Sequence, residues 1–414
     1  METSNIIIAI NTLWVMFGAV LVFFMQAGFG MVEAGFIRAK NTCNILTKNF
    51  MDFAMASLGF FVIGYALMFG SSQLGLIGTT GFALKGLPAL TGDLPTFVHW
   101  LFQAMFAGAA ATIVAGAMAG RMKFKAYLIY SFLISAVVYP IIGHWIWNGS
   151  GWLANLGFLD FAGSTVVHAT GGWAAFIGAY LLGARIGKYN KDGSANAIVG
   201  HNIPLASLGV FILWFGWFGF NAGSTLSGMD YTTIARVAIN TNLAAAAGAF
   251  VSMIVVWLKF GKPDLSMIMN GALAGLVAIT APCAFVSPIA SIIIGSIAGV
   301  IIVFGVSFVD RLLVDDPVGA VAVHGFNGLW GTLAVGLFSL ESGLFYGHGV
   351  HQLFVQAIGV FSAIAFVVIS MFIIFKIIDA TIGLRVSREE ELKGLDIEEH
   401  GMESYAGFQL FANE

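Results

Sequence analysis

The stretch Asp160-Phe-Ala-Gly-Ser-Thr-Val-Val-His168-Ala-Thr-Gly-Gly172 places a histidine inside an apolar segment, and its pattern occurs twice in the chain. The second copy is Asp316-Pro-Val-Gly-Ala-Val-Ala-Val-His324-Gly-Phe-Asn-Gly328. Each copy has the same spacing from aspartate to histidine to glycine. An imidazole in a membrane span is costly and commonly functional. The repetition therefore predicts a duplicated fold whose two halves meet at a shared polar site.

The composition of the chain is that of a membrane protein. Of its 414 residues, 59% are hydrophobic and only 9% are charged, whereas charged residues make up about a quarter of a soluble domain. Apolar segments of about twenty residues, long enough to cross a hydrocarbon core of roughly 30 Å, recur along the sequence. They do not alternate as barrel strands do, and lipid offers the backbone no hydrogen-bond partners, so they are predicted to be helices. We predict eleven of them, at residues 6–36, 45–70, 97–120, 125–147, 163–184, 200–224, 233–258, 267–281, 286–308, 318–340 and 351–379.

Lysine and arginine residues predict the orientation of these spans. With eleven spans the two termini lie on opposite sides of the membrane. If the N-terminus is outside, every one of the 18 Lys and Arg residues except Lys85 and Arg236 falls on the inner side. The positive-inside rule then predicts N-out, C-in in the cytoplasmic membrane. Residues 1–5 carry no basic side chain, so no cleavable signal peptide is expected, and no basic cluster suggests a nucleic-acid partner.

The positions of the two motif copies divide the chain into repeated halves. The copies open the fifth and tenth predicted helices, so residues 1–184 form one five-helix half and residues 185–340 form another. Because five is odd, the second half enters the membrane inverted, which is the plan of many transporters with sites near the midplane. An eleventh helix follows within 341–380, and a polar cytoplasmic tail within 381–414. The predicted fold class is an all-α polytopic membrane protein.

The spacing within each copy predicts where its polar groups lie. Asp160 and Asp316 are expected at helix N-termini, where a carboxylate caps free N–H groups and suits the helix dipole. Eight residues of helix advance about 12 Å, close to half of a core of roughly 30 Å. His168 and His324 should therefore meet near mid-depth from opposite faces. The alternative is a pair of packed, hydrogen-bonded residues without a role in transport.

Other ionisable residues have simpler interpretations. Asp52 is expected to pair with Lys48 one turn earlier, and Glu33 with a neighbour near the inner end of the first helix. Contact with water explains three histidines near span ends, His99, His144 and His201. No metal site, disulfide framework or cofactor is predicted from the remaining candidates, His348, His351, Cys43 and Cys283.

Several segments resemble signatures of the ammonium transporter (Amt/Mep/Rh) family, in the family's order. Besides Asp160–His168, they are Gly216-Trp-Phe-Gly-Phe-Asn-Ala-Gly-Ser224, the segment from Val314 to Gly325, Gly383-Leu-Arg-Val, Gly394-Leu-Asp and Glu399-His-Gly. One departure is Gly163-Ser164, where the family has two glycines. The resemblance runs from the first helix to the tail. It implies a homotrimer with one pore per subunit, and a tail that docks on the cytoplasmic face and responds to a PII-type regulatory protein.

The resemblance also implies roles for individual residues. Trp147, Phe106 and Ser224 match an outer site that recruits ammonium, supported by the Asp160 carboxylate. Phe106 and Phe220 match a gate of two phenyl rings. The twin pore histidines correspond to His168 and His324, and Trp217 to an aromatic residue of the pore wall. Of the two tryptophans in His144-Trp-Ile-Trp147, the second fits the family pattern better than Trp145.

The chemistry of ammonium fits these residue types. An aromatic face attracts a desolvated cation by roughly 0.5–2 kcal/mol, and a hydroxyl oxygen accepts a hydrogen bond that ammonium donates and potassium cannot. The expected function is transport of ammonium or ammonia, with methylammonium as an analogue, and not an enzymatic activity. Two alternatives stay open: an ammonium sensor with the same fold, and a Rh-like channel for neutral gas. The short polar segment after the last predicted span, within 381–414, disfavours the sensor, and Trp147 and Ser224 favour the ammonium branch.

Overall fold

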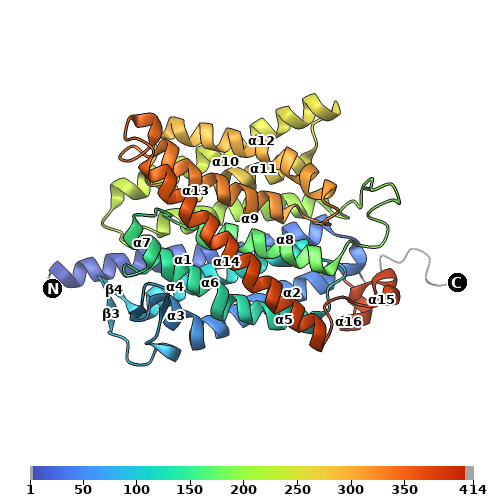
Figure 1. The fold of residues 1–414 in the computed structure, drawn as a ribbon, viewed down its shortest axis with the longest axis horizontal. Coiled ribbons are helices and arrows are strands. Elements are labelled where there is room, and N and C mark those ends of the chain that lie inside the picture. The colour runs from blue at the N-terminus through green and yellow to red at the C-terminus, as the bar shows by residue number, and fades with distance from the viewer. Residues whose placement is uncertain (1–2, 406–414) are drawn as a thin grey trace.

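The computed structural model describes residues 3–405 as a bundle of long helices that run roughly along its longest dimension (Figure 1). The longer α-helices are α1 (Thr3–Phe36), α2 (Thr42–Gly59), α4 (Thr96–Ala117), α5 (Phe124–Leu133), α8 (Thr170–Leu182), α9 (Ile203–Trp217), α10 (Tyr231–Phe260), α11 (Leu265–Thr280), α12 (Pro288–Arg311), α13 (Asn327–Phe338) and α14 (His351–Thr381). Shorter ones are α3 (Tyr65–Phe69), α6 (Tyr139–Trp147), α7 (Trp152–Leu156), α15 (Arg388–Lys393) and α16 (Leu395–His400).

π-Helical turns join two pairs of these helices end to end and begin or end three others. The π-helical segments are η2 (Phe60–Gly64), η4 (Ile134–Val138), η5 (Ser164–Ala169), η6 (Phe218–Ala222) and η7 (Val321–Phe326). Short 3₁₀ turns are η1 (Ala39–Asn41), η3 (Phe82–Leu84) and η8 (Leu344–Tyr346). The strands form two small antiparallel pairs, β1 (Ser72–Gln73) with β2 (Ile77–Gly78), and β3 (Leu90–Thr91) with β4 (Leu94–Pro95).

The predicted membrane spans agree with the helices in position. Within residues 3–405, 10 helical stretches are long and apolar enough to cross a membrane. The remaining predicted span, at 267–281, corresponds to α11, an apolar helix of only 16 residues. At 1.5 Å per residue this helix is about 24 Å long, shorter than a hydrocarbon core of roughly 30 Å. An eleven-helix count therefore depends on α11 and stays a prediction.

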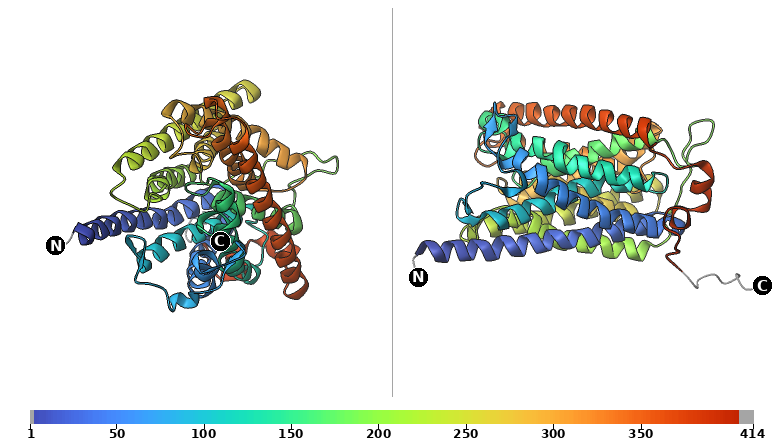
Figure 2. Two further views of the ribbon diagram at one scale, coloured as in Figure 1. Left: turned by 60° about the vertical axis from the view of Figure 1, so that its left-hand side comes forward. Right: turned by 90° about the horizontal axis from the view of Figure 1, so that it is seen from below.

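The two ends of the bundle carry different parts of the chain. Helix α1 begins at one end, and the C-terminal helices α15 and α16 lie at the opposite end (Figure 2). We call the end where α1 begins the outer end and the end with α15 and α16 the inner end, after the predicted orientation. The side of the membrane that each end faces is still predicted from the basic residues alone.

The first helix packs against α9 through closely spaced backbones. A Cβ atom added at Gly35 would lie 2.5 Å from the Ala206 nitrogen, and one added at Gly28 would lie 3.0 Å from the Gly209 oxygen. The partner numbers fall along one helix as they rise along the other, so the two helices are antiparallel. Small residues permit this approach in membrane proteins, where packing replaces the hydrophobic effect between helices.

The two motif copies also cross each other in antiparallel fashion. A Cβ atom added at Gly172 would lie 2.1 Å from the Gly325 nitrogen, and one added at Gly328 would lie 2.8 Å from the Ala169 nitrogen. Each copy therefore places its final glycine against the residue that follows the histidine of the other copy. This exchange of equivalent contacts brings η5 and η7 together at the centre of the bundle.

The C-terminal tail is docked on the inner end. The Asp396 carboxylate accepts hydrogen bonds from the backbone nitrogens of Cys43 at 3.0 Å and Asn44 at 2.8 Å. The Glu399 carboxylate accepts one from the Phe124 nitrogen at 2.8 Å. The described part of the tail is therefore docked on this end of the bundle, and that this end faces the cytoplasm stays a prediction. Residues 406–414 of the predicted tail lie outside the described residues.

Candidate functional site

The two motif aspartates cap the segments that carry the histidines. The Asp160 carboxylate is buried and accepts hydrogen bonds from four backbone nitrogens in succession, those of Gly163, Ser164, Thr165 and Val166. Asp316 accepts hydrogen bonds from the nitrogens of Gly319 and Val321. The predicted caps are confirmed. Because the first N–H groups of a helix have no intrahelical acceptor, these carboxylates satisfy donors that would otherwise be buried alone.

Both histidines lie on π-helical turns, which the sequence did not predict. His168 is part of η5 and His324 is part of η7, and Phe220 lies on a third such turn, η6. A π-helical turn holds one residue more than an α-helical turn, so it changes which side chains face the centre. Such turns are rare and are frequent at functional sites.

The two imidazoles are in direct contact at the centre of the bundle. The Nδ1 atoms of His168 and His324 are 3.1 Å apart, and the rings are stacked with centroids 5.2 Å apart. Because a neutral imidazole has one donor and one acceptor nitrogen, one Nδ1 donates and the other accepts. The two Nε2 atoms then differ, one being an acceptor and the other a donor. The Nε2 atom of His168 is buried and has no hydrogen-bond partner among residues 3–405.

A cavity opens toward the outer end from the side of His168. Its volume is about 170 Å³, and it is lined by Phe69, His99, Phe102, Gln103, Phe106, Trp147, Phe161, Ser224 and Leu226. Trp147 lines it, whereas Trp145 donates its Nε1–H to the Leu76 carbonyl. The Ser224 hydroxyl donates to the Phe220 carbonyl at 2.8 Å, which leaves its oxygen lone pairs free to accept from a bound group.

Two phenyl rings separate this outer cavity from the histidine pair. The ring centroids of Phe106 and Phe220 are 4.0 Å apart, and Phe220 stacks on His168 at 5.4 Å. Trp217 stacks on the same imidazole at 5.0 Å. The residues predicted as gate and pore therefore form one continuous line of rings.

Asp160 contacts the outer cavity only through Trp147, which lines it. Its backbone oxygen accepts a hydrogen bond from Trp147 Nε1 at 2.7 Å, while its carboxylate is occupied by the capping bonds. Asp160 thus holds both the indole that lines the outer cavity and the turn that carries His168. It is not among the residues that line that cavity.

Two further cavities lie on the inner side of His324. The first has a volume of about 20 Å³ and is lined by residues that include Phe29, Glu33 and His324. The second has a volume of about 430 Å³ and reaches Asp316 and Arg185. Both are lined by Asn270 and Val318. The outer cavity, the ring pair, the histidine pair and the two inner cavities therefore follow one another through the bundle.

His99 is a residue of the outer cavity that the sequence pattern did not indicate. His99 was expected to be wetted at a span end, but it is buried, lines the outer cavity and bonds Tyr65 Oη through Nδ1 at 2.9 Å. His144 is also buried and contacts the Met68 carbonyl, so the same expectation is wrong there. His201 is half-buried and bonds the Ile37 carbonyl. Only tertiary packing distinguishes such residues from solvated ones.

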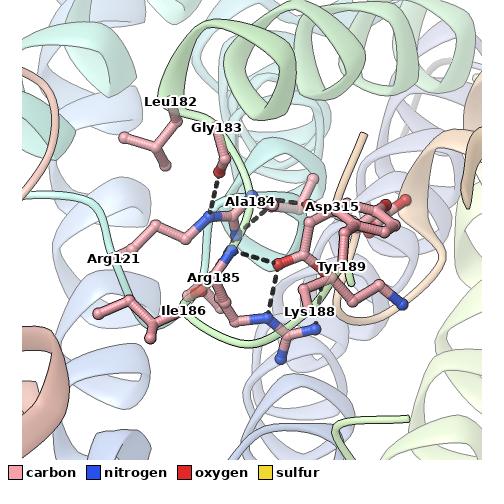
Figure 3. A network of polar contacts seen from close by, with 12 residues as sticks. Arg121, Leu182, Gly183, Ala184, Arg185, Ile186, Lys188, Tyr189 and Asp315 are labelled. Atoms are coloured by element: carbon pink, nitrogen blue, oxygen red, sulfur yellow. Dashed lines mark hydrogen bonds and ion pairs between the residues drawn. The ribbon is translucent and has the colours of Figure 1, made fainter. Parts of the chain in front are cut away.

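A buried ionic cluster supports the start of the His324 segment (Figure 3). The Asp315 carboxylate accepts hydrogen bonds from the backbone nitrogen, Nε and Nη2 of Arg185, each at 2.8 Å. Arg121 donates to the Asp315 backbone oxygen and to the Gly183 carbonyl. Burial raises the pKa of Asp315, but the hydrogen bond of Arg185 and the charges of Arg121 and Arg185 outweigh it and lower the pKa to about 2.

This depressed pKa gives a pH dependence with a definite sign. A carboxyl whose pKa is lower in the folded protein stabilises it above the unfolded pKa, and the contribution disappears as the pH falls through the folded value. For a fall from 3.8 to about 2, the contribution is about 2 kcal/mol at neutral pH. We expect the difference in thermal unfolding midpoint between wild type and Asp315→Asn to shrink as the pH falls from about 4 to about 2. Asp93→Asn, at an exposed position, is the control, and a difference that stays constant over this range would contradict the assignment.

A bundle of apolar helices with a line of polar and aromatic groups between two end cavities has the architecture of a membrane transport protein. The model of the Ammonium Transporter Family matches residues 13–405. Ammonium transporter Amt2 of Archaeoglobus fulgidus is 49% identical, over 96% of this chain and 89% of its own length. Ammonium transporter Amt1 of Haloferax mediterranei is 39% identical, over 96% and 80%.

Solved structures agree with the sequence comparison. A structure described as Sensor Amt Protein superposes with a TM-score of 0.92 and 43% identity, covering 96% of this chain and 99% of its own. Mep2 of Candida albicans gives a TM-score of 0.85 and 32% identity, covering 92% and 87%. The chain belongs to the ammonium transporter family.

Proposed function

We propose that the protein transports ammonium or ammonia across the cytoplasmic membrane. The outer cavity binds ammonium, the ion loses a proton, and ammonia passes the two phenyl rings and the histidine pair. The observation that carries this proposal is the hydrogen bond between His168 and His324, in line with cavities on both sides. The proton either stays outside or crosses separately.

The lining of the outer cavity suits a small cation that donates hydrogen bonds. Trp147 and Phe106 offer ring faces, and Ser224 offers an oxygen acceptor. Among the described residues, no carboxylate lines this cavity. Binding would therefore rest on cation–π attraction and one hydrogen bond rather than on an ion pair. Such a site releases its cation more readily than a charged one.

The energetics of the path favour ammonia over ammonium beyond the rings. An isolated cation in a low-dielectric interior costs tens of kcal/mol by Born estimates. Releasing a proton from an amine with a pKa of about 10 costs about 4 kcal/mol at pH 7. Neutral imidazoles then provide the donor and the acceptor that a passing ammonia molecule needs.

Two inverted halves, 1–184 and 185–340, are part of the proposal. The exchanged contacts of Gly172 and Gly328 support it, because a two-fold relation between the halves produces contacts of this kind. The proposal also includes an eleventh transmembrane helix within 341–380, a cytoplasmic tail within 381–414 and the N-out, C-in orientation. A homotrimer and a PII-type regulator at the inner face rest on the family resemblance, and the docked tail is compatible with both.

Sensing is the second candidate function, because one of the superposed structures is described as a Sensor Amt Protein. A sensor would bind ammonium in the outer cavity without net uptake. The presence of cavities on both sides of the histidine pair favours transport instead. Uptake of labelled methylammonium into proteoliposomes separates the two functions, since binding without uptake would support the sensor.

Removal of the outer indole tests the recruitment site. We expect Trp147→Ala to raise the half-saturating methylammonium concentration by about tenfold, because a desolvated cation–π contact is worth up to roughly 2 kcal/mol. Ser224→Ala should act in the same direction. Uptake in proteoliposomes over a range of concentrations measures both. Trp257→Ala, at an exposed position on α10, is the control, and unchanged half-saturation in Trp147→Ala would exclude this site.

A further inference from the structure

A buried acidic side chain lies next to the histidine pair on its inner side. Glu33 follows Phe29 by one helical turn on α1, so both side chains lie on one helix face. Both line the small cavity together with His324, and the Phe29 and His324 ring centroids are 6.3 Å apart. Glu33 is only 3% exposed. Its carboxyl therefore faces the same small space as the inner imidazole.

The two charged residues nearest to Glu33 on α2, Lys48 and Asp52, form hydrogen bonds with other residues. The expected ion pair between Asp52 and Lys48 is wrong: Asp52 accepts hydrogen bonds from Gln26, Thr112 and Tyr127, and Lys48 Nζ donates to the Met122 carbonyl at 2.7 Å. Glu33 pairs with a neutral amide, since Asn49 Nδ2 donates to its Oε2 at 2.8 Å. Within residues 3–405, no ion pair includes Glu33.

This environment is unusual for a structural carboxyl group. An ionised carboxylate away from water is strongly disfavoured unless a cation lies beside it. No cation of the described residues 3–405 fills that place, and the small cavity lies beside the carboxyl. The carboxyl is therefore positioned either to hold a proton or to pair with a cation that enters the cavity.

We propose that Glu33 returns a proton to ammonia on the inner side of the histidine pair, a step that rests on the proposed function. The O–H bond of the carboxyl breaks and a new N–H bond forms, which gives ammonium and a carboxylate side by side. A water molecule of the wide inner cavity then gives a proton to the carboxylate and becomes hydroxide, and ammonium and hydroxide leave through the same cavity. This proton transfer is the same whether the proton removed at the outer cavity stays outside or crosses the membrane by another route.

The dimensions of the cavities fit this step. The small cavity has a volume of about 20 Å³, and a cavity needs roughly 10–15 Å³ to hold one water-sized molecule. It therefore accepts one ammonia molecule at a time. Asn270 and Val318 line both this cavity and the wide one, and Asn270 Nδ2 donates to the Val318 carbonyl at 3.2 Å. These two residues mark the exit from the small cavity.

Few ionisable groups near Glu33 could donate or accept a proton in its place. Lys48 and Asp52 on α2 act on its charge from a distance, and His324 on η7 shares its cavity. The other helices that line the cavity, α4, α9 and α11, contribute neutral side chains, among them Ile113, Leu213 and Leu273. Glu33 and His324 are thus the groups of this cavity that can exchange a proton.

Glu33→Gln tests the proposal, because the amide keeps the size and the Asn49 contact but cannot supply the proton. In proteoliposomes we expect methylammonium uptake to fall by about tenfold or more, in the range of a lost general acid. Wild-type uptake should decrease as the internal pH rises from 6 to 8, and Glu33→Gln should lose this dependence. Glu33→Asp should retain it. Asp52→Asn, a buried acid that lines none of the cavities described above, is the matched control and should also retain it.

Infrared difference spectra provide a second readout that does not depend on transport. Addition of ammonium to the wild-type protein should change a carboxyl band that is missing in Glu33→Gln and present in Asp52→Asn. An unchanged pH dependence in Glu33→Gln, an equal loss in Asp52→Asn, or a wild-type spectrum without a carboxyl response would overturn the role of Glu33. Wild-type protein that takes up no methylammonium would instead count against the proposed function.

Discussion

Methylammonium uptake is expected to fall by about tenfold to a hundredfold when both His168 and His324 are replaced by alanine. Each imidazole offers a passing ammonia molecule a hydrogen bond worth roughly 1–1.5 kcal/mol, and a loss of about 1.4 kcal/mol corresponds to a factor of ten. The double variant would remove both imidazoles from the path between the outer and the inner cavities. Initial uptake rates in proteoliposomes at matched protein density measure the effect.

The single variants and a distant histidine complete this experiment. His168→Ala and His324→Ala should each lose less than the double variant, since the remaining imidazole keeps both of its nitrogens. His351→Ala, at an exposed position where α14 begins, should transport as the wild type does. A double variant with wild-type rates and wild-type discrimination against potassium would reduce the pair to a packing element.

Gly172→Ala and Gly328→Ala are each expected to prevent recovery of a stable folded protein. The new Cβ atom would lie 2.1 Å from the Gly325 nitrogen in the first case and 2.6 Å from the Ser164 oxygen in the second. Both obstacles are backbone atoms, so neither can turn away as a side chain would. Forcing an added methyl group into a packed core costs typically 1–3 kcal/mol, and a backbone clash at the central crossing should exceed that range.

The yield of monodisperse protein in detergent and its thermal unfolding midpoint measure this effect. Gly149→Ala is a suitable control, because no atom lies within 4 Å of the position its Cβ would occupy. It should express and unfold like the wild type. If Gly172→Ala behaves in the same way, the two motif segments do not cross as closely as described.

The polar framework of the site was predictable because it depends on local spacing. A repeated aspartate, histidine and glycine at fixed intervals allowed the caps at Asp160 and Asp316 to be predicted, and their hydrogen bonds confirm them. The contact of His168 with His324 followed from the same repetition. Hydropathy located the long helices within a few residues. Each of these features is encoded by neighbours along the chain.

Features that depend on tertiary contacts were not predictable in the same way. The π-helical turns at His168, His324 and Phe220 leave no clear pattern in the sequence. Burial of His99 results from packing of distant segments, so its position near a span end gave the wrong expectation. Helical spacing suggested that Asp52 and Lys48 would pair, but Asp52 has a better partner on α5, and Lys48 has one in the segment between α4 and α5. The choice of Phe106 among 38 phenylalanines required the family resemblance.

The bond between the two Nδ1 atoms has a consequence for symmetry. The backbones of the two motif segments exchange equivalent contacts. The hydrogen bond between the two Nδ1 atoms, however, contains a single proton, which is covalently bound to only one of the two rings. The protonation of the two imidazoles is therefore asymmetric, although the backbone contacts around them are equivalent. Two arrangements exist, differing in which ring presents a bare nitrogen toward its neighbours and which presents a hydrogen. Transfer of that proton between the two Nδ1 atoms, together with loss of a proton at one Nε2 atom and gain of one at the other, converts one arrangement into the other without moving any heavy atom.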